Sequence, residues 1–146
     1  MAEHQITFLS YAKEDKQSVI EYYEKLKSDG FNPWLDERCI LPGQEWDIVI
    51  RDTIKDARIF IVFLSEASLK KRGYIQREIR LALDAAEEIP PQDLFIIPVR
   101  LQPCEIPDRL AKWQTADLYE PDGYKRLKAS LAGATSWINL YEKAAT

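Results

Sequence analysis

The stretch from Arg58 to Ala86 constrains the fold more than any other part of the 146-residue chain. Residues 58–64 read RIFIVFL, an apolar run without the alternation of a strand that has one face in solvent. Such a run is typical of a strand buried on both faces, which implies a parallel sheet covered by helices. After Gly73, apolar residues recur at helical spacing, at positions 75, 79, 82, 83 and 86. The stretch therefore predicts a buried strand followed by a helix that packs on the sheet.

The same order of strand and helix recurs along the chain. We expect strands at 5–9, 31–35, 58–64, 94–99 and 115–119, and helices at 15–30, 46–57, 75–86 and 121–131. Segment 101–113 is rich in proline and is expected to be irregular, with one helical turn at 108–110. Five β–α units in succession predict an α/β fold: a flavodoxin-like, doubly wound, five-stranded parallel sheet of strand order 2-1-3-4-5, with helices on both faces. We expect a single domain over 1–146, with a core at 4–132 and a C-terminal apolar extension at 133–146.

Composition removes several classes of function. The net charge is -4, and cations are mixed with acids throughout, so no basic stripe predicts a nucleic-acid partner. No apolar run approaches the ~20 residues that span a bilayer, and the N-terminus lacks signal-peptide character, so we expect no membrane contact and a cytoplasmic location. Two distant cysteines and a single histidine argue against a metal site, a Ser-His-Asp relay or a disulfide framework.

A functional site in such a sheet is expected beyond the carboxyl ends of the strands. Those ends lead into segments 10–15, 36–45, 65–73 and 101 onward, and Glu78, near the start of the third helix, faces the same edge. The helical neighbours of Glu78 include no cation: they are Tyr74, Ile75, Leu81 and Ala82. The carboxylate therefore either pairs with a basic residue from a loop or lies in a cleft with a shifted pKa, and both interpretations stay open.

Other proteins of this topology fit the loops poorly. A phosphoryl-accepting receiver domain has acids where this chain has Leu9-Ser10 and Leu64-Ser65. A flavodoxin has a glycine- and hydroxyl-rich phosphate cradle after the first strand, and segment 10–15 has no glycine and two acids. Neither a P-loop nor a G-x-G-x-x-G motif occurs in the chain.

Three boxes, in order, resemble those of Toll/interleukin-1 receptor (TIR) domains in their bacterial form. The residues that carry the resemblance are Phe8-Leu9-Ser10-Tyr11 with Asp15, Trp34-Leu35-Asp36 with Leu41-Pro42-Gly43 and Trp46, and Phe63-Leu64-Ser65 with Ser68 and the helix that holds Glu78. The resemblance spans about residues 4–132, and the ordered combination of boxes is specific although each box alone is weak.

The resemblance implies a reaction. Many TIR domains, prokaryotic ones especially, cleave NAD+ between nicotinamide and ribose with a glutamate that stands four residues after an aromatic residue. Tyr74 and Glu78 have this spacing, with Tyr where the bacterial motif often has Trp. The resemblance thus implies that Glu78 is catalytic and that NAD+ is a substrate, with no cofactor. Nicotinamide departs as a neutral molecule from a pyridinium cation, so no general acid is required and one carboxylate can suffice.

The resemblance also implies substrate-binding residues: Ser10, Tyr11, Asp36, Arg38, Trp46, Ser65, Ser68 and Tyr74. Ser10 and Tyr11 would line the floor of the cleft, and Ser65 and Ser68 would lie near the ribose or the amide. Asp36 and Arg38 would reach the ribose or pyrophosphate, while Trp46 and Tyr74 would offer aromatic surfaces. Ordinary roles stay open beside these: capping for the serines, a solvated loop for Asp36 and Arg38, and core packing for Trp46.

Two functions follow from the resemblance. The first is an NAD+-consuming enzyme of bacterial immune signalling, such as antiphage defence. It would be either a glycohydrolase that releases ADP-ribose or a cyclase that makes a cyclic ADP-ribose isomer. The second is a non-catalytic TIR adaptor, or an effector that mimics the TIR proteins of a host. Both imply other TIR domains as partners, in a homo-oligomer or filament.

Overall fold

The computed structural model describes residues 6–35, 40–70, 75–90 and 94–145, and gives only the backbone for Glu78 and residues 137–145. Its strands are β1 (Ile6–Ser10), β2 (Asn32–Trp34), β3 (Ile59–Leu64), β4 (Phe95–Arg100) and β5 (Ala116–Asp117). Its α-helices are α1 (Lys16–Ser28), α3 (Trp46–Asp56), α4 (Arg77–Ala86) and α5 (Gly123–Ala145), and single 3-10 turns are η1 (Lys13–Asp15) and η3 (Asp108–Leu110). None of the helices in these ranges is both long and apolar enough to cross a membrane.

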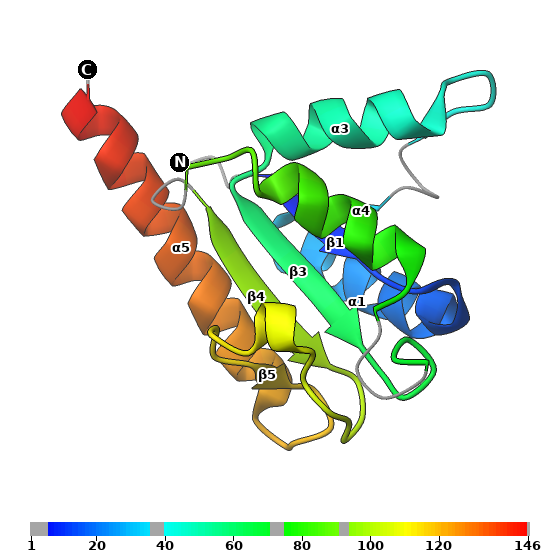
Figure 1. Cartoon of the computed structure of the whole chain (residues 1–146). Coiled ribbons are helices and arrows are strands. Elements are labelled where there is room, and N and C mark those ends of the chain that lie inside the picture. The colour runs from blue at the N-terminus through cyan, green and yellow to red at the C-terminus, as the bar shows by residue number, and fades with distance from the viewer. Residues whose placement is uncertain (1–5, 36–39, 71–74, 91–93, 146) are drawn as a thin grey trace.

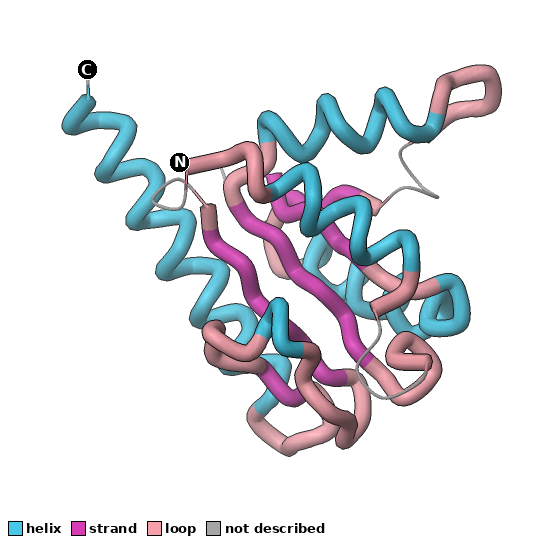
Figure 2. The backbone as a smooth tube through the Cα atoms, in the orientation of Figure 1, coloured by secondary structure: helices cyan, strands magenta, loops and turns pink. Residues whose placement is uncertain are grey.

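The five strands form one parallel sheet in the order β2-β1-β3-β4-β5, which confirms the expected topology (Figure 2). β3 lies at the centre, where Phe60 is in register with Phe8 of β1 and Ile96 of β4. All six residues of β3 are buried, so the apolar run correctly predicted a strand covered on both faces.

Helices cover the two faces of the sheet in pairs (Figure 1). On one face, Phe60, Val62 and Leu64 of β3 belong to a core shared with α3 and α4. On the other face, the remaining three residues of β3 belong to a core shared with α1 and α5. Because side chains alternate along a strand, each residue of β1 and β3 is assigned to one helical layer by its position in the sequence.

Two boundaries differ from the expectation at the C-terminal end. β5 is shorter than the predicted 115–119, because the chain turns after Asp117, where the amide of Glu120 donates to the Asp117 carbonyl at 3.1 Å. The prediction that the last helix ends at Leu131 was wrong, since α5 continues to Ala145 and contains the backbone of the predicted apolar extension. The helix tolerates Gly133, whose cost is only about 1 kcal/mol, because Ala134 and Thr135 continue its buried face.

Candidate active site

Ser10, the last residue of β1, has a buried hydroxyl. It is paired in register with Val62 of β3 and is only 4% exposed. Within the described part of the chain, no group forms a hydrogen bond with its Oγ. Strand alternation places Ser10 on the same face as Phe8, which is the face covered by α3 and α4. Buried polar atoms without a partner are rare, so this hydroxyl is the first candidate for a contact with a ligand.

Asp15, in η1, is a buried carboxylate that joins the end of β1 to the loop after β3. Both of its oxygens lie 2.7 Å from the hydroxyl of Ser65, which donates to them. Burial raises the pKa of Asp15, and the hydrogen bond from Ser65 opposes that rise. From the sequence, Asp15 was expected to open a helix and was counted in the first box of the resemblance, but its burial was not predicted. No local pattern distinguishes a buried acid from a solvated one at such a position.

Ser65 and Ser68 satisfy each other within the loop that follows β3. The amide of Ser65 donates to Ser68 Oγ at 2.8 Å, and the Ser68 hydroxyl donates to the Ser65 carbonyl at 2.9 Å. The amide of Ser68 in turn donates to Ser65 Oγ at 3.1 Å. Both residues are almost fully buried. These contacts support the structural role that the sequence left open for the two serines, and their predicted contact with substrate stays a prediction.

A second set of contacts ties η1 and this loop to the start of α4. Glu14 forms an ion pair with Lys70 at 3.5 Å. A hydrogen bond from its own backbone, followed by one from Gln76, lowers the pKa of Glu14. Gln76 precedes the first residue of α4, and its side-chain amide donates to the Ala67 carbonyl at 2.9 Å. The ends of β1 and β3 and the first turn of α4 are therefore held as one unit.

The backbone of Glu78 is the second residue of α4. Figure 1 shows that α4 begins at the edge of the sheet toward which the β3 arrow points, as expected from the sequence. The side chain of Glu78 lies outside the described atoms, and so do the residues Asp36, Arg38 and Tyr74. The roles expected for these four residues remain predictions.

The other two predicted residues lie on different faces of the sheet. Trp46, the first residue of α3, is half-buried against the α3–α4 core, and it lines a hollow with Glu45, Asp47 and Arg77. It thus stands beside the residue that precedes Glu78. Tyr11 is half-buried against the α1–α5 core on the opposite face. The structure therefore brings Ser10, Trp46 and the start of α4 to one layer, and places Tyr11 on the other.

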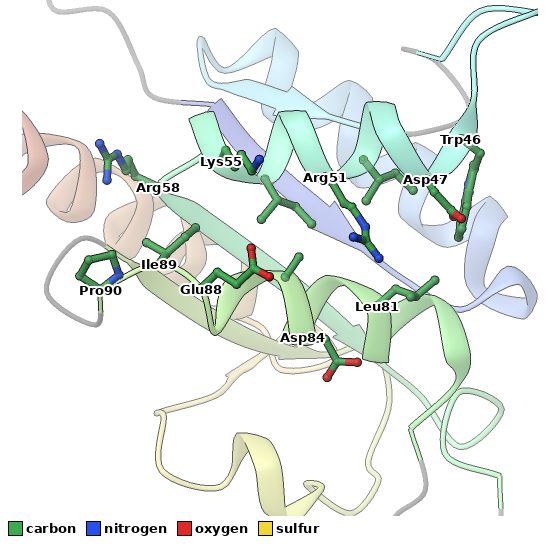
Figure 3. A pocket seen from close by; sticks show the side chains of 13 residues that line it. Trp46, Asp47, Arg51, Lys55, Arg58, Leu81, Asp84, Glu88, Ile89 and Pro90 are labelled. Carbon is green, nitrogen blue, oxygen red and sulfur yellow. The ribbon is translucent and has the colours of Figure 1, made fainter.

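A groove between α3 and α4 was not predicted from the sequence. Its volume is about 380 Å³, and it extends from Trp46 along both helices to Pro90 (Figure 3). Arg51 and Lys55 project from α3, while Asp84 projects from α4 and Glu88 lies in the turn that follows it. The sequence does place charged residues four apart, Arg51 and Lys55 on α3 and Asp84 and Glu88 around the end of α4, but this spacing is equally typical of a solvent-exposed flank. Among the described side chains, no three His, Cys, Asp or Glu residues gather as ligands of a metal.

The fold is a flavodoxin-like α/β domain, and the candidate site lies at the carboxyl ends of β1 and β3. The family model described as "TIR domain" matches residues 7–129. The chain therefore belongs to the TIR domain family.

Three known proteins show the range of relatives. An uncharacterized protein, y4cD, of Sinorhizobium fredii is 26% identical over 88 residues, which cover 60% of this chain and 14% of that protein. This chain thus spans a small part of the length of that relative. The TIR domain of the Toll-related receptor TRR-2 of Hydra magnipapillata superposes with a TM-score of 0.71 at 24% identity, covering 86% of this chain and 97% of that one. A Clostridium botulinum CMP N-glycosidase, BcmB, superposes with a TM-score of 0.57 at 17% identity, covering 86% and 99%. At these identities, the two superpositions show only that this chain shares their fold.

Proposed function

We propose that this chain cleaves the N-glycosidic bond between nicotinamide and ribose in NAD+, with Glu78 as the catalytic residue. The observation that carries the proposal is the hydroxyl of Ser10, which has no hydrogen-bond partner among the described residues and is buried beneath the helical layer whose α4 begins with Arg77 and Glu78. Membership of the TIR family supports it, because the aromatic-x-x-x-Glu spacing of Tyr74 and Glu78 is the one that NAD+-cleaving members use. A protein of similar fold is described as an N-glycosidase that acts on CMP, a related class of bond.

The chemistry requires little of the protein. The bond between the ribose C1′ and the pyridinium nitrogen breaks, and its electron pair stays with nitrogen, so nicotinamide leaves without being protonated. Glu78 would hold the ribose hydroxyls and stabilise the positive charge that develops on C1′ and the ring oxygen, in a cleft with restricted water. Water then attacks C1′ and loses one proton to give ADP-ribose. Attack by an atom of the adenine instead gives a cyclic ADP-ribose isomer.

The remaining residues would bind and orient the substrate. Ser10 would offer its hydroxyl at the floor of the cleft. Tyr11 follows it in the sequence and lies on the opposite face of the sheet, against the α1–α5 core. Trp46 and Tyr74 would offer aromatic surfaces to the substrate. Asp36 and Arg38 would contact the ribose or the pyrophosphate. Ser65 and Ser68 would lie near the ribose or amide while their hydroxyls hold the loop.

A second function is favoured by a different observation, the charged groove between α3 and α4. A TIR adaptor, or an effector that mimics host TIR proteins, would use such a surface to bind another TIR domain and would need no catalytic carboxylate. TIR domains commonly self-associate. We place the enzyme first and propose that self-assembly activates it, in bacterial immune signalling within the cytoplasm.

Nicotinamide release from NAD+ tests the proposal. It is measured at several protein concentrations, including a surface-clustered condition, for the wild-type chain, Glu78→Gln and a control, Glu87→Gln. Glu87 directly follows the last residue of α4 and is exposed, with an ion pair to Arg109 at 2.7 Å, so the control makes the same chemical change outside the site. We expect release that rises faster than linearly with protein concentration, survives in Glu87→Gln and is lost in Glu78→Gln. The proposal would be overturned if no nicotinamide is released under clustered conditions, or if folded Glu78→Gln still releases nicotinamide. Either result would favour the adaptor.

A further inference from the structure

The start of α4 is not fixed by a cap of its own. Gln76 precedes the helix with an extended backbone, and within the described part of the chain its side chain forms no capping hydrogen bond. The first amides of a helix have no partner inside the helix, so an uncapped start tends to fray. Arg77 and the backbone of Glu78 lie in this first turn. The position of the turn therefore depends on contacts with the rest of the molecule.

The side chain of Gln76 reaches away from α4 to two other segments. Its amide donates to the carbonyl of Ala67, in the loop that follows β3, at 2.9 Å. It also forms a hydrogen bond with the carboxylate of Glu14, in η1, which follows β1. Because a side-chain amide has two hydrogens, these two acceptors can take both. Gln76 thus joins the start of α4 to the chain that leaves β1 and to the chain that leaves β3.

Glu14 is a strong acceptor for this bond. A hydrogen bond from its own backbone and then the one from Gln76 lower the pKa of Glu14, so the carboxylate is ionised at neutral pH. Hydrogen bonds to an ionised acceptor are stronger than those between neutral groups. The ion pair of Glu14 with Lys70, at 3.5 Å, contributes less, because the side chain of Lys70 is 69% exposed. Among these contacts, the bond from Gln76 is therefore the main connection between η1 and α4.

The segments that Gln76 contacts are held together without it. Asp15 follows Glu14 in η1, and both of its carboxylate oxygens lie 2.7 Å from the hydroxyl of Ser65, in the loop after β3. Both residues are buried, so this bond is shielded from solvent. Removal of the Gln76 amide should consequently release the start of α4 and leave η1 and the loop in place.

We propose that Gln76 is a positioning residue, which holds the first turn of α4, and with it the backbone of Glu78, against the ends of β1 and β3. The inference rests on the proposed function, in which Glu78 is the catalytic residue. Gln76 does not itself touch the substrate, because both of its donors have acceptors in the protein. Catalysis by a single carboxylate depends on its placement, and a misplacement of about 1 Å can cost roughly a hundredfold in rate. Loss of the Gln76 amide should therefore lower kcat far more than it changes KM.

Amide hydrogen exchange of the whole chain without NAD+, followed by NMR, tests whether Gln76 holds the turn. The reporter is the amide of Arg80, which donates to the Gln76 carbonyl at 3.0 Å. The reference is the amide of Glu87, which donates to the Leu83 carbonyl at 3.1 Å at the other end of α4.

The variants change only the chemistry of the side chain at position 76. Gln76→Met keeps its length and removes both donors, and Gln76→Glu replaces the donors by a charged acceptor that repels Glu14. The control is Gln17→Met, the same change at an exposed position of α1. We expect the Arg80 amide to exchange roughly tenfold faster in both Gln76 variants and at the wild-type rate in the control. Exchange of the Glu87 amide should stay unchanged in all of them.

Nicotinamide release by the same proteins, under clustered conditions, tests what the positioning does for the reaction. We expect kcat to fall roughly tenfold or more in Gln76→Met, with KM changed by less than about threefold and with Tm close to that of the wild type. The proposal is overturned if the Arg80 amide exchanges at the wild-type rate in both Gln76 variants, or if faster exchange leaves kcat unchanged. A wild-type chain that releases no nicotinamide would overturn the proposed function, while the exchange rates would still decide whether Gln76 holds the turn.

Discussion

Ser10→Ala and Ser65→Ala remove the same atom from two buried serines, and we expect opposite effects on stability. The two residues are 4% and 1% exposed, and both lie at the carboxyl edge of the sheet. They differ in their partners, because the hydroxyl of Ser65 is hydrogen-bonded and, within the described residues, that of Ser10 is not. The pair thus isolates the contribution of hydrogen bonding from that of burial.

The size of each effect follows from these contacts. Ser65→Ala removes a hydrogen bond to the Asp15 carboxylate and another from the Ser68 amide, which together are worth about 2–4 kcal/mol of unfolding free energy. Ser10→Ala removes a hydroxyl whose burial without a partner costs about 1–3 kcal/mol, so we expect stability to rise by about 1 kcal/mol or more. For a chain of this length, each kcal/mol corresponds to about 2–4 °C in Tm.

Urea unfolding followed by tryptophan fluorescence measures both variants against the wild type. The midpoint is expected to rise for Ser10→Ala and to fall for Ser65→Ala, with unchanged slopes. If the Ser10 hydroxyl serves the substrate, Ser10→Ala also lowers nicotinamide release although it is the more stable protein. A loss of stability in Ser10→Ala similar to that in Ser65→Ala would refute the reasoning, because the hydroxyl would then be satisfied by the protein and would not mark a site.

Two further changes test the electrostatics and the packing. Burial raises the pKa of Asp15, so the carboxyl group binds its proton more tightly in the folded chain than in the unfolded chain. The stability that this proton contributes is present at low pH and is lost as pH rises from about 3.8 through the raised pKa. Asp15→Asn keeps an acceptor for Ser65 and should remove this slope from urea unfolding measured across that range. A Cβ at Gly123 would collide with the backbone carbonyl of Asp117, so Gly123→Ala should lose about 1–3 kcal/mol. Gly133→Ala, with open space around the added methyl, should gain about 0.5–1 kcal/mol in the same helix, and equal effects of the two in thermal unfolding would contradict this account.

The sheet was predictable from sequence because its strongest signal is local. The run at β3 has no polar residue between Ile59 and Leu64, and parallel strands joined by helices admit few orders. The end of α5 was missed because residues 133–146 were expected to form a separate apolar extension, whereas Gly133 costs a helix only about 1 kcal/mol and Ala134 after it is buried. The predicted β5 was too long because the ends of so short an edge strand depend on its contacts with β4, which the sequence does not show. Among these contacts, Nε and Nη2 of Arg100 donate to the two carboxylate oxygens of Asp117 at 2.7 and 2.8 Å.

The candidate site was predictable in position but not in detail. The carboxyl edge of the sheet follows from topology, which is why Ser10, Ser65 and the start of α4 were expected together. Which hydroxyl is satisfied depends on contacts between residues 50 positions apart, such as Ser65 with Asp15, and no local pattern encodes them. The groove was missed for the same reason, since charges on the flank of one helix gain meaning only from the helix beside it.

The proposed chemistry and the proposed self-assembly involve the same two helices. Ser10 and Trp46 lie in the layer of α3 and α4, the catalytic candidate is the second residue of α4, and Arg77, which lines a hollow with Trp46, immediately precedes it. A second copy that engages Arg77 would therefore act on the first turn of α4, where Glu78 stands. If assembly strengthens NAD+ binding by some factor through this turn, thermodynamic linkage requires NAD+ to strengthen assembly by the same factor. Assembly-gated activity then needs no separate trigger in the domain, because substrate and partner each stabilise the arrangement that the other requires.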